Sequence, residues 1–124
     1  MKAKILVVED EKSLSEAYEL ILKSSGYKVT LANDGAEGLE LAESFEPDLV
    51  LLDLRMPRVS GIEFLRKYQL VDKHPHVKVI VFSNMDTQKE IDEAYELGAT
   101  HYILKAWASP KELTRLVADT LSNT

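Results

Sequence analysis

The stretch DLVLLD, residues 48–53, decides the fold. Four apolar residues stand in a row between two aspartates, without the alternation of apolar and polar residues that a half-exposed strand shows. A central strand of a parallel sheet is covered on both faces and is therefore continuously apolar. Residues 48–53 are predicted to form such a strand, with the carboxylate of Asp53 at its carboxyl end.

Short apolar runs alternate with segments of helical period along the whole chain. The predicted strands are residues 4–8, 28–32, 48–53, 77–82 and 101–104, and the less apolar run at 28–32 is expected near an edge of the sheet. Strict alternation of five strands and five helices implies right-handed crossovers and a parallel sheet between two helical layers. The predicted class is a doubly wound α/β fold.

Each predicted helix carries an inward face or a terminal signal. The first helix has Leu14, Ala17, Tyr18 and Ile21 on one face and ends at Gly26, and the second spans residues 34–45. The third lies near 62–71 with Ile62, Leu65 and Tyr68 facing inward, and the fourth carries Ile91, Ala94, Tyr95 and Leu97 and ends at Gly98. The fifth is capped by Ser109, begins at Pro110 and buries Leu113, Leu116, Val117 and Leu121.

Length and composition narrow the class of protein. The 124 residues are 45% hydrophobic, which fits one globular domain over residues 1–124, and the sequence ends with the fifth helix, so we expect no output domain in it. With 15 basic and 21 acidic residues the net charge is −6, which disfavours direct binding to nucleic acid or to an anionic membrane. Cysteine is absent and no signal peptide or membrane span is visible, so a cytoplasmic protein is expected.

Polar residues gather where the predicted strands end. Glu9 and Asp10 follow the first strand, Asp53 the third, Ser83 the fourth and Lys105 the fifth. Open α/β sheets bind ligands beyond these carboxyl ends. Three carboxylates in one crevice repel one another unless a cation joins them, and Mg²⁺ prefers such oxygen ligands. The acids after the first strand would repel a nucleotide or flavin phosphate, which needs free backbone amides instead.

These residues, together with the loop signature D-x-x-M-P-x-x-x-G at 53–61, resemble the receiver domain of two-component response regulators. The match covers the whole chain in order and spacing. It implies a flavodoxin-like (βα)5 fold with strand order 2-1-3-4-5. It also implies signal transduction rather than metabolic catalysis, with no enzymatic activity beyond self-catalysed phosphotransfer and autodephosphorylation.

The resemblance assigns a role to each acid of the cluster. Asp53 would accept a phosphoryl group from a sensor histidine kinase, a phosphotransfer protein or a small phosphodonor. Asp10 and Asp53 would ligate Mg²⁺ directly, joined by the backbone carbonyl of Arg55, and Glu9 would act through a bound water. Glu11 lies past the strand end and is expected to serve only the helix that follows.

The resemblance also implies a switch. Lys105 would pair with one phosphoryl oxygen, and the Ser83 hydroxyl would donate a hydrogen bond to another. Tyr102 stands where the family places an aromatic residue that moves inward when the hydroxyl is drawn toward the phosphoryl group. That motion would reshape the face made by the fourth helix, the fifth strand and the fifth helix, where a downstream protein binds. A core aromatic nevertheless explains Tyr102 better than a switch residue does, even within the family pattern.

Four positions depart from the usual receiver pattern or vary within it. Ala106 replaces the proline that normally follows the lysine through a cis peptide. A cis bond to alanine is disfavoured by about 2.5–4 kcal/mol, so we expect a trans bond and an altered loop. Asn84 is larger than the small residue usual after the hydroxyl. Arg55 and Met85 occupy positions that influence how water attacks the acyl phosphate, and an altered phospho-aspartate lifetime is predicted.

Two alternatives remain open from the sequence. If the loop after Lys105 is displaced, the chain could be a receiver-like interaction module that accepts no phosphoryl group. It could also be a phosphohydrolase with an aspartyl nucleophile, although such enzymes place a second acid two residues after the nucleophile and Arg55 stands there. Incubation with a small phosphodonor distinguishes the interaction module from a receiver that is phosphorylated. Turnover of a phosphomonoester tests the phosphohydrolase alternative.

Overall fold

The five predicted strands form one parallel sheet. The computed structural model describes residues 2–56, 59–83, 87–105 and 109–122. The strands are β1 (Lys4–Val8), β2 (Lys28–Ala32), β3 (Leu49–Leu52), β4 (Lys78–Ser83) and β5 (His101–Leu104). Their order is β2-β1-β3-β4-β5, so the predicted order and the edge position of residues 28–32 are confirmed. The flavodoxin-like class predicted from the resemblance is therefore correct.

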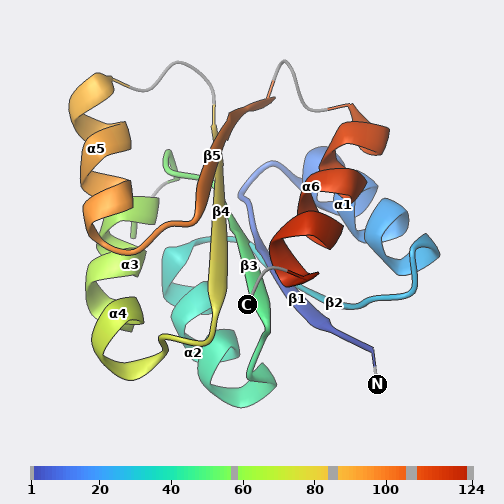
Figure 1. Ribbon diagram of the computed structural model, residues 1–124, viewed down its shortest axis with the longest axis horizontal. Helices are drawn as coiled ribbons and strands as arrows, with labels where there is room; N and C mark the ends of the chain where they lie inside the picture. The colour runs from blue at the N-terminus through green and yellow to red at the C-terminus, as the bar shows by residue number, and fades with distance from the viewer. Residues whose placement is uncertain (1, 57–58, 84–86, 106–108, 123–124) are drawn as a thin grey trace.

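Helices cover both faces of the sheet. They are α1 (Lys12–Ser24), α2 (Gly35–Phe45), α3 (Gly61–Tyr68), α4 (Leu70–Lys73), α5 (Gln88–Glu96) and α6 (Pro110–Ser122). In Figure 1, α1 and α6 lie on one side of the sheet and α2 to α5 on the other. Each strand contributes alternate side chains to two separate cores: Val50 and Leu52 pack on the side of α2 to α5, and Leu49 and Leu51 on the side of α1 and α6.

The third predicted helix, residues 62–71, is wrong in one respect, because the chain breaks it at Gln69. Gln69 has a left-handed backbone (φ 53°) and separates α3 from the short α4. The burial pattern explains the break. Residues 64, 65 and 68 are buried with helical spacing, but the next buried residue is Leu70, while Val71 is 60% exposed. A continuous helix could not turn Leu70 into the core at that position.

Two residues predicted to face inward are exposed. Tyr95 of α5 is 46% exposed, since the inward side of the helix runs through Ala94 and Leu97 and leaves Tyr95 beside it. Ala17 of α1 is exposed for the same reason. The buried residues of α1 are Ser15, Tyr18 and Leu22.

Side-chain caps define where several helices begin. Asp34 is the N-cap of α2 and accepts a hydrogen bond from the Glu37 backbone N–H. The Ser109 hydroxyl accepts one from the Glu112 N–H at 3.2 Å, which confirms the predicted cap of the last helix. Thr87 and Glu90 form a reciprocal capping box at the start of α5.

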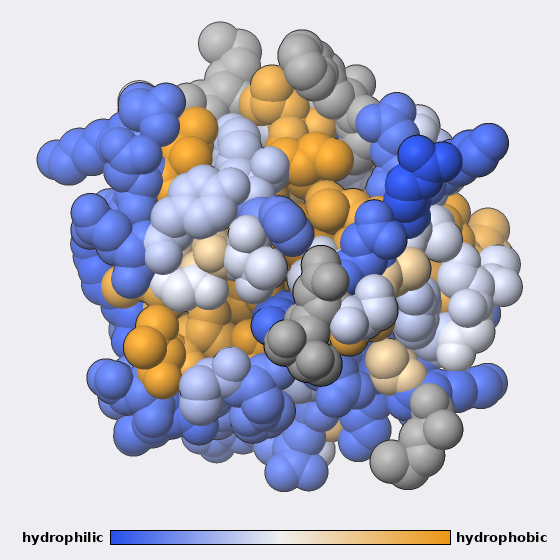
Figure 2. All heavy atoms as spheres, viewed as in Figure 1, coloured by the Kyte–Doolittle hydropathy of each residue, from blue (hydrophilic) through white to orange (hydrophobic). Residues whose placement is uncertain are grey.

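The face that carries β5 exposes apolar surface. Figure 2 shows hydrophobic surface interrupting the hydrophilic shell on the face where β5 forms the front edge of the sheet in Figure 1. All four residues of β5 are half-buried, as expected for an edge strand. Within the described ranges, no helix combines the length and the apolar character that crossing a bilayer requires.

Candidate functional site

Two neighbouring central strands bring three carboxylates together at their carboxyl ends. Glu9 and Asp10 directly follow β1, and Asp53 directly follows β3. The Asp53 backbone N–H donates to the carbonyl of Val8 at 3.0 Å, which continues the parallel ladder past the last paired residues. Glu9, Asp10 and Asp53 each present a carboxylate oxygen, and these three oxygens lie within 4.8 Å of one another.

Lys105 supplies the positive charge of this cluster. Its Nζ lies 3.0 Å from Oδ2 of Asp53 and 2.5 Å from Oε1 of Glu9. The contact with Asp53 is a hydrogen bond. Oε1 of Glu9 accepts no well-directed hydrogen bond and faces the ammonium as an ion pair. Only 13% of the Lys105 side chain is exposed, so this ammonium is largely withdrawn from water.

Burial of Glu9 dominates the electrostatics of the cluster. Glu9 is fully buried, and the loss of hydration raises its pKa from 4.5 to about 7. Lys105 opposes this rise and the negative charge of Asp53 adds to it. Burial alone would lower the pKa of Lys105, but its contacts with Glu9 and Asp53 outweigh that effect and the pKa is raised.

The donor set fits a hard divalent cation. The cluster holds three carboxylates, and Lys105 pairs with two of them, so full ionisation leaves two negative charges uncompensated. Asp10 is exposed while Glu9 and Asp53 are buried, so one ligand faces solvent and the other two lie at the base of the cluster. Oxygen ligands with this charge are the kind that Mg²⁺ binds while it keeps several waters.

An open hollow of about 460 Å³ lies over the cluster. Its lining residues are Glu9, Asp10, Glu11, Asp53, Arg55, Ser83 and Lys105. Ser83 is the last residue of β4 and is fully buried. Arg55 contacts the Asp53 carboxylate through its backbone, because its N–H donates to Oδ1 of Asp53 at 3.1 Å. From the part of the chain that the structure describes, Asp53 thus accepts one hydrogen bond on each carboxylate oxygen, and it lines a hollow that a ligand can enter.

Close packing against the backbone explains why the loop after Asp53 ends in a glycine, Gly61. The Gly61 N–H donates to the Leu54 carbonyl at 3.0 Å, which draws the start of α3 against the loop. A Cβ at this position would lie 2.5 Å from the Asp53 carbonyl oxygen and 2.6 Å from Cα of Leu54. Both obstacles are backbone atoms, so the backbone that presents Asp53 tolerates only glycine here.

The structure gathers most of the residues that the sequence singled out. Lys105 reaches Asp53 although alanine follows it. Tyr102 does not line the hollow and packs, half-buried, against the core under α2 to α5. Glu11 does more than begin α1: its side chain makes no capping hydrogen bond, but its N–H donates to Oε2 of Glu9 at 3.1 Å. Asn84, Met85 and Ala106 lie outside the described residues.

Sequence reasoning missed Glu90, which the structure links to the site. Nη2 of Arg55 lies 2.8 Å from Oε1 of Glu90 at the start of α5. The pattern Thr87-x-x-Glu90 is the sequence signature of a capping box and could have located this helix start. Nothing in the sequence indicated that Arg55 would contact it.

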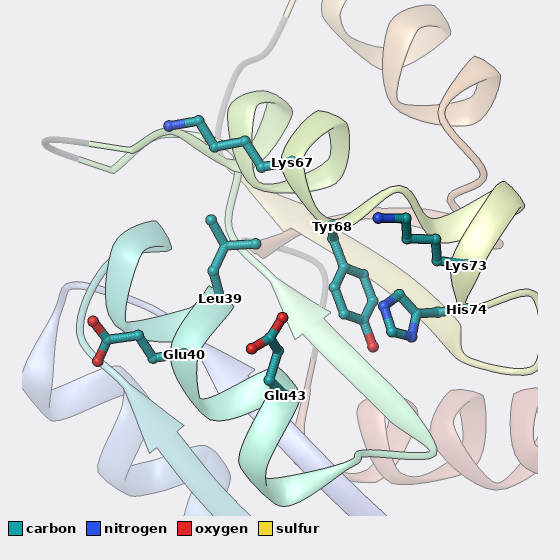
Figure 3. Close-up of a pocket in the computed structure, with 7 residues that line it drawn as sticks. All are labelled: Leu39, Glu40, Glu43, Lys67, Tyr68, Lys73 and His74. Carbon is teal, nitrogen blue, oxygen red and sulfur yellow. The ribbon is translucent and has the colours of Figure 1, made fainter.

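A second hollow lies among α2, α3 and α4 and lacks the buried charged residues of the first. Figure 3 shows it between α2 and the α3–α4 segment. The ring of Tyr68 stacks on His74 with centroids 4.1 Å apart, and burial raises the pKa of Tyr68 to about 12. The charged side chains of its lining, Glu40, Glu43, Lys67 and Lys73, belong to exposed residues, so no buried charge is held ready for a ligand.

Comparison with known proteins points to one family. A family model described as a response regulator receiver domain matches residues 5–118. Response regulator MprA of Mycolicibacterium vanbaalenii is 36% identical over 118 residues, which are 95% of this chain and 50% of that protein. MprA of Mycobacterium tuberculosis is 35% identical with the same coverage. The chain spans about half the length of these curated relatives.

Solved structures agree with the family model. A CheY-like response regulator receiver domain protein from Methanospirillum hungatei superimposes with a TM-score of 0.90 at 27% identity, covering 98% of this chain and 94% of that one. The Vibrio cholerae chemotaxis protein CheY4 gives a TM-score of 0.88 at 25% identity, covering 97% and 99%. Fold, family model and curated relatives thus point the same way.

Proposed function

The chain belongs to the response regulator receiver family of two-component signalling, and on this premise we propose that it accepts a phosphoryl group on Asp53. The observation that carries the proposal is the environment of that carboxylate. Asp53 is held by hydrogen bonds from Lys105 Nζ at 3.0 Å and from the Arg55 N–H at 3.1 Å, at the base of an open hollow. The carboxylate is thus oriented and paired with a cation, and it lies at a hollow that opens to solvent.

The reaction is a transfer of one phosphoryl group. A carboxylate oxygen of Asp53 attacks phosphorus, and the bond between phosphorus and the nitrogen or oxygen of the donor breaks. The electron pair and, where required, a proton go to the leaving group. Water later attacks the same phosphorus, the acyl phosphate bond breaks, and the Asp53 carboxylate returns. Such transfers depend on positioning and on neutralising the phosphoryl oxygens.

Mg²⁺ would be held by Asp10, Asp53 and the backbone carbonyl of Arg55, with Glu9 acting through a bound water, and it would neutralise charge on the phosphoryl oxygens. Lys105 already contacts Asp53 and neutralises part of the same charge. Ser83 ends β4 within the same hollow and would donate its hydroxyl to a phosphoryl oxygen. A cation bound here would oppose the raised pKa of Glu9, because a cation favours the ionised carboxylate.

A downstream protein would bind the face made by α5, β5 and α6. These elements are the fourth helix, fifth strand and fifth helix predicted from the sequence, renumbered because the short α4 is counted separately. Tyr102 on β5 would be the switch residue. The half-exposed strand β5 and the exposed ring of Tyr95 on α5 support a protein contact there. The proposed partners are a sensor histidine kinase or phosphotransfer protein upstream and a protein downstream, acting in the cytoplasm without direct contact to nucleic acid or membrane.

The two alternatives are less well supported. An interaction module that accepts no phosphoryl group was expected if Lys105 failed to reach the site, and Lys105 reaches it. A phosphohydrolase needs a general acid close to the nucleophile. The side chain two residues after Asp53 is that of Arg55, which donates a hydrogen bond to Glu90. Self-catalysed phosphotransfer and slow autodephosphorylation remain the only reactions proposed.

Incubation with acetyl phosphate and Mg²⁺, followed by intact mass measurement, tests the proposal. Wild type should gain one phosphoryl group, and a chelator should suppress the gain. Asp53→Asn should gain none, while the control Asp72→Asn, at an exposed position on α4, should behave as wild type. Absence of the adduct on wild type, or its persistence on Asp53→Asn, would refute the proposal.

A further inference from the structure

One side chain connects the Asp53 site to the start of α5. Arg55 donates its backbone N–H to Oδ1 of Asp53 at 3.1 Å, and its guanidinium donates to Oε1 of Glu90 at 2.8 Å. The two ends of this residue therefore touch the acceptor carboxylate and a helix that belongs to the proposed output face. Arg55 is more than half exposed in its side chain, so the guanidinium can move without disturbing the core.

Glu90 is itself part of the structure that begins α5. Its Oε1 accepts hydrogen bonds from the Thr87 N–H at 3.2 Å and from the Thr87 hydroxyl at 3.0 Å, and its own N–H donates to that hydroxyl. The Thr87 hydrogen bonds are the main cause of the lowered pKa of Glu90, and Arg55 lowers it further. One carboxylate oxygen thus serves the helix cap and the arginine together.

Phosphorylation of Asp53 changes what Arg55 faces. An acyl phosphate adds about one negative charge and three acceptor oxygens to the hollow that Arg55 already lines. A guanidinium pairs with phosphoryl oxygens in a forked geometry and prefers them to a single carboxylate oxygen. Glu90 and the phosphoryl group would then compete for the same guanidinium.

We propose that Arg55 exchanges partners when Asp53 is phosphorylated: it binds Glu90 in the unmodified state and the phosphoryl oxygens in the modified state. The cap of α5 thereby loses a charged donor, and the charge on Asp53 is transmitted to the proposed output helix by a route separate from Ser83 and Tyr102. This inference rests on the proposed function, since it concerns how the same site communicates.

The chain provides a matched control for a purely structural role. Arg66 of α3 forms an ion pair with Glu93, which lies on α5 as Glu90 does. The exposed fractions of the Arg66 and Glu93 side chains, 55% and 29%, match the 55% and 30% of Arg55 and Glu90. Arg66 does not line the hollow over Asp53. If these pairs only brace α3 and the loop that precedes it against α5, removing either acid should have the same effect.

Binding of fluoroberyllate, a stable mimic of a phosphoryl group on a carboxylate, tests the exchange. In the presence of Mg²⁺, Glu90→Gln should bind fluoroberyllate about 1.5- to 5-fold more tightly than wild type, the range that loss of one exposed ion pair supports. Glutamine can still complete the capping box, so the helix start is retained. Glu93→Gln should bind as wild type, and in an Arg55→Gln background Glu90→Gln should have no effect.

A structural readout accompanies the titration. The amide of Thr87 donates to Glu90, so its NMR signal should shift on fluoroberyllate binding in wild type and should shift less in Arg55→Gln. Equal effects of Glu90→Gln and Glu93→Gln, or an effect that persists without Arg55, would overturn the exchange while leaving the proposed function intact. A wild-type protein that binds no fluoroberyllate would overturn both.

Discussion

Replacing Glu9 by glutamine should change how the stability of the metal-free protein depends on pH. Glu9 is fully buried and its pKa is raised to about 7, from 4.5 in the unfolded chain. The folded protein therefore binds this proton more strongly than the unfolded chain does. The resulting stabilisation is complete below pH 4.5 and is lost as the pH rises through 7.

The size of the effect follows from the two pKa values. At about 1.4 kcal/mol per pKa unit, the Glu9 contribution falls by roughly 2 to 3 kcal/mol between pH 5 and pH 8. Glutamine has the same shape and does not titrate. Relative to Glu9→Gln, wild type should thus lose roughly 2 to 3 kcal/mol of unfolding free energy over this range.

Urea unfolding at pH 5 and pH 8 in the presence of a chelator measures this difference. The comparison of wild type with Glu9→Gln cancels the titration of groups that both proteins share. Glu11→Gln, at an exposed neighbour of Glu9, is the control and should show no such trend. A difference between wild type and Glu9→Gln that stays constant with pH would refute the conclusion that burial of Glu9 governs this site.

Three further perturbations test separate parts of the site. Mg²⁺ at about 100 times its dissociation constant should stabilise wild type by about 2.7 kcal/mol in thermal unfolding. Asp10→Asn should lose most of this stabilisation and Glu11→Gln should keep it. Equal stabilisation of the two variants by Mg²⁺ would contradict the ligand assignment. Lys105→Met should destabilise the metal-free protein by roughly 3 kcal/mol at pH 8 in urea, and by less at pH 5, where Glu9 binds a proton; a loss independent of pH would count against the ion pairs. Gly61→Ala should reduce stability by roughly 1–3 kcal/mol because its Cβ meets backbone atoms, and an unchanged urea midpoint would show that the loop can yield.

The layout of the fold could be predicted because each strand is marked by a short, largely apolar run and its carboxyl end by a polar residue. Asp53 and Glu9 could be placed at one edge from their positions after strands that a parallel sheet aligns. The break at Gln69 could not be predicted, since a left-handed residue other than glycine carries no local signal. Tyr95 was misplaced because two adjacent residues of a helix can each fit an inward stripe of period 3.6, and packing decides between them.

The candidate site could be predicted in composition but not in its contacts. Residue types at strand ends indicated three acids and one lysine. Their mutual distances depend on side-chain conformations, which burial of Glu9 and the ion pairs of Lys105 determine. The contact between Arg55 and Glu90 joins residues 35 positions apart whose local patterns are unrelated. Such contacts arise from tertiary packing, which periodicity does not encode.

Chemical mapping of the phosphorylated residue tests the central claim most directly. After incubation with acetyl phosphate and Mg²⁺, reduction with borohydride converts an aspartyl phosphate to homoserine, and peptide mass spectrometry locates the converted residue. The account predicts conversion at position 53, with the other aspartates unchanged, including Asp10 in the same hollow. Conversion at another aspartate, or at none in a protein that folds and binds Mg²⁺, would contradict it.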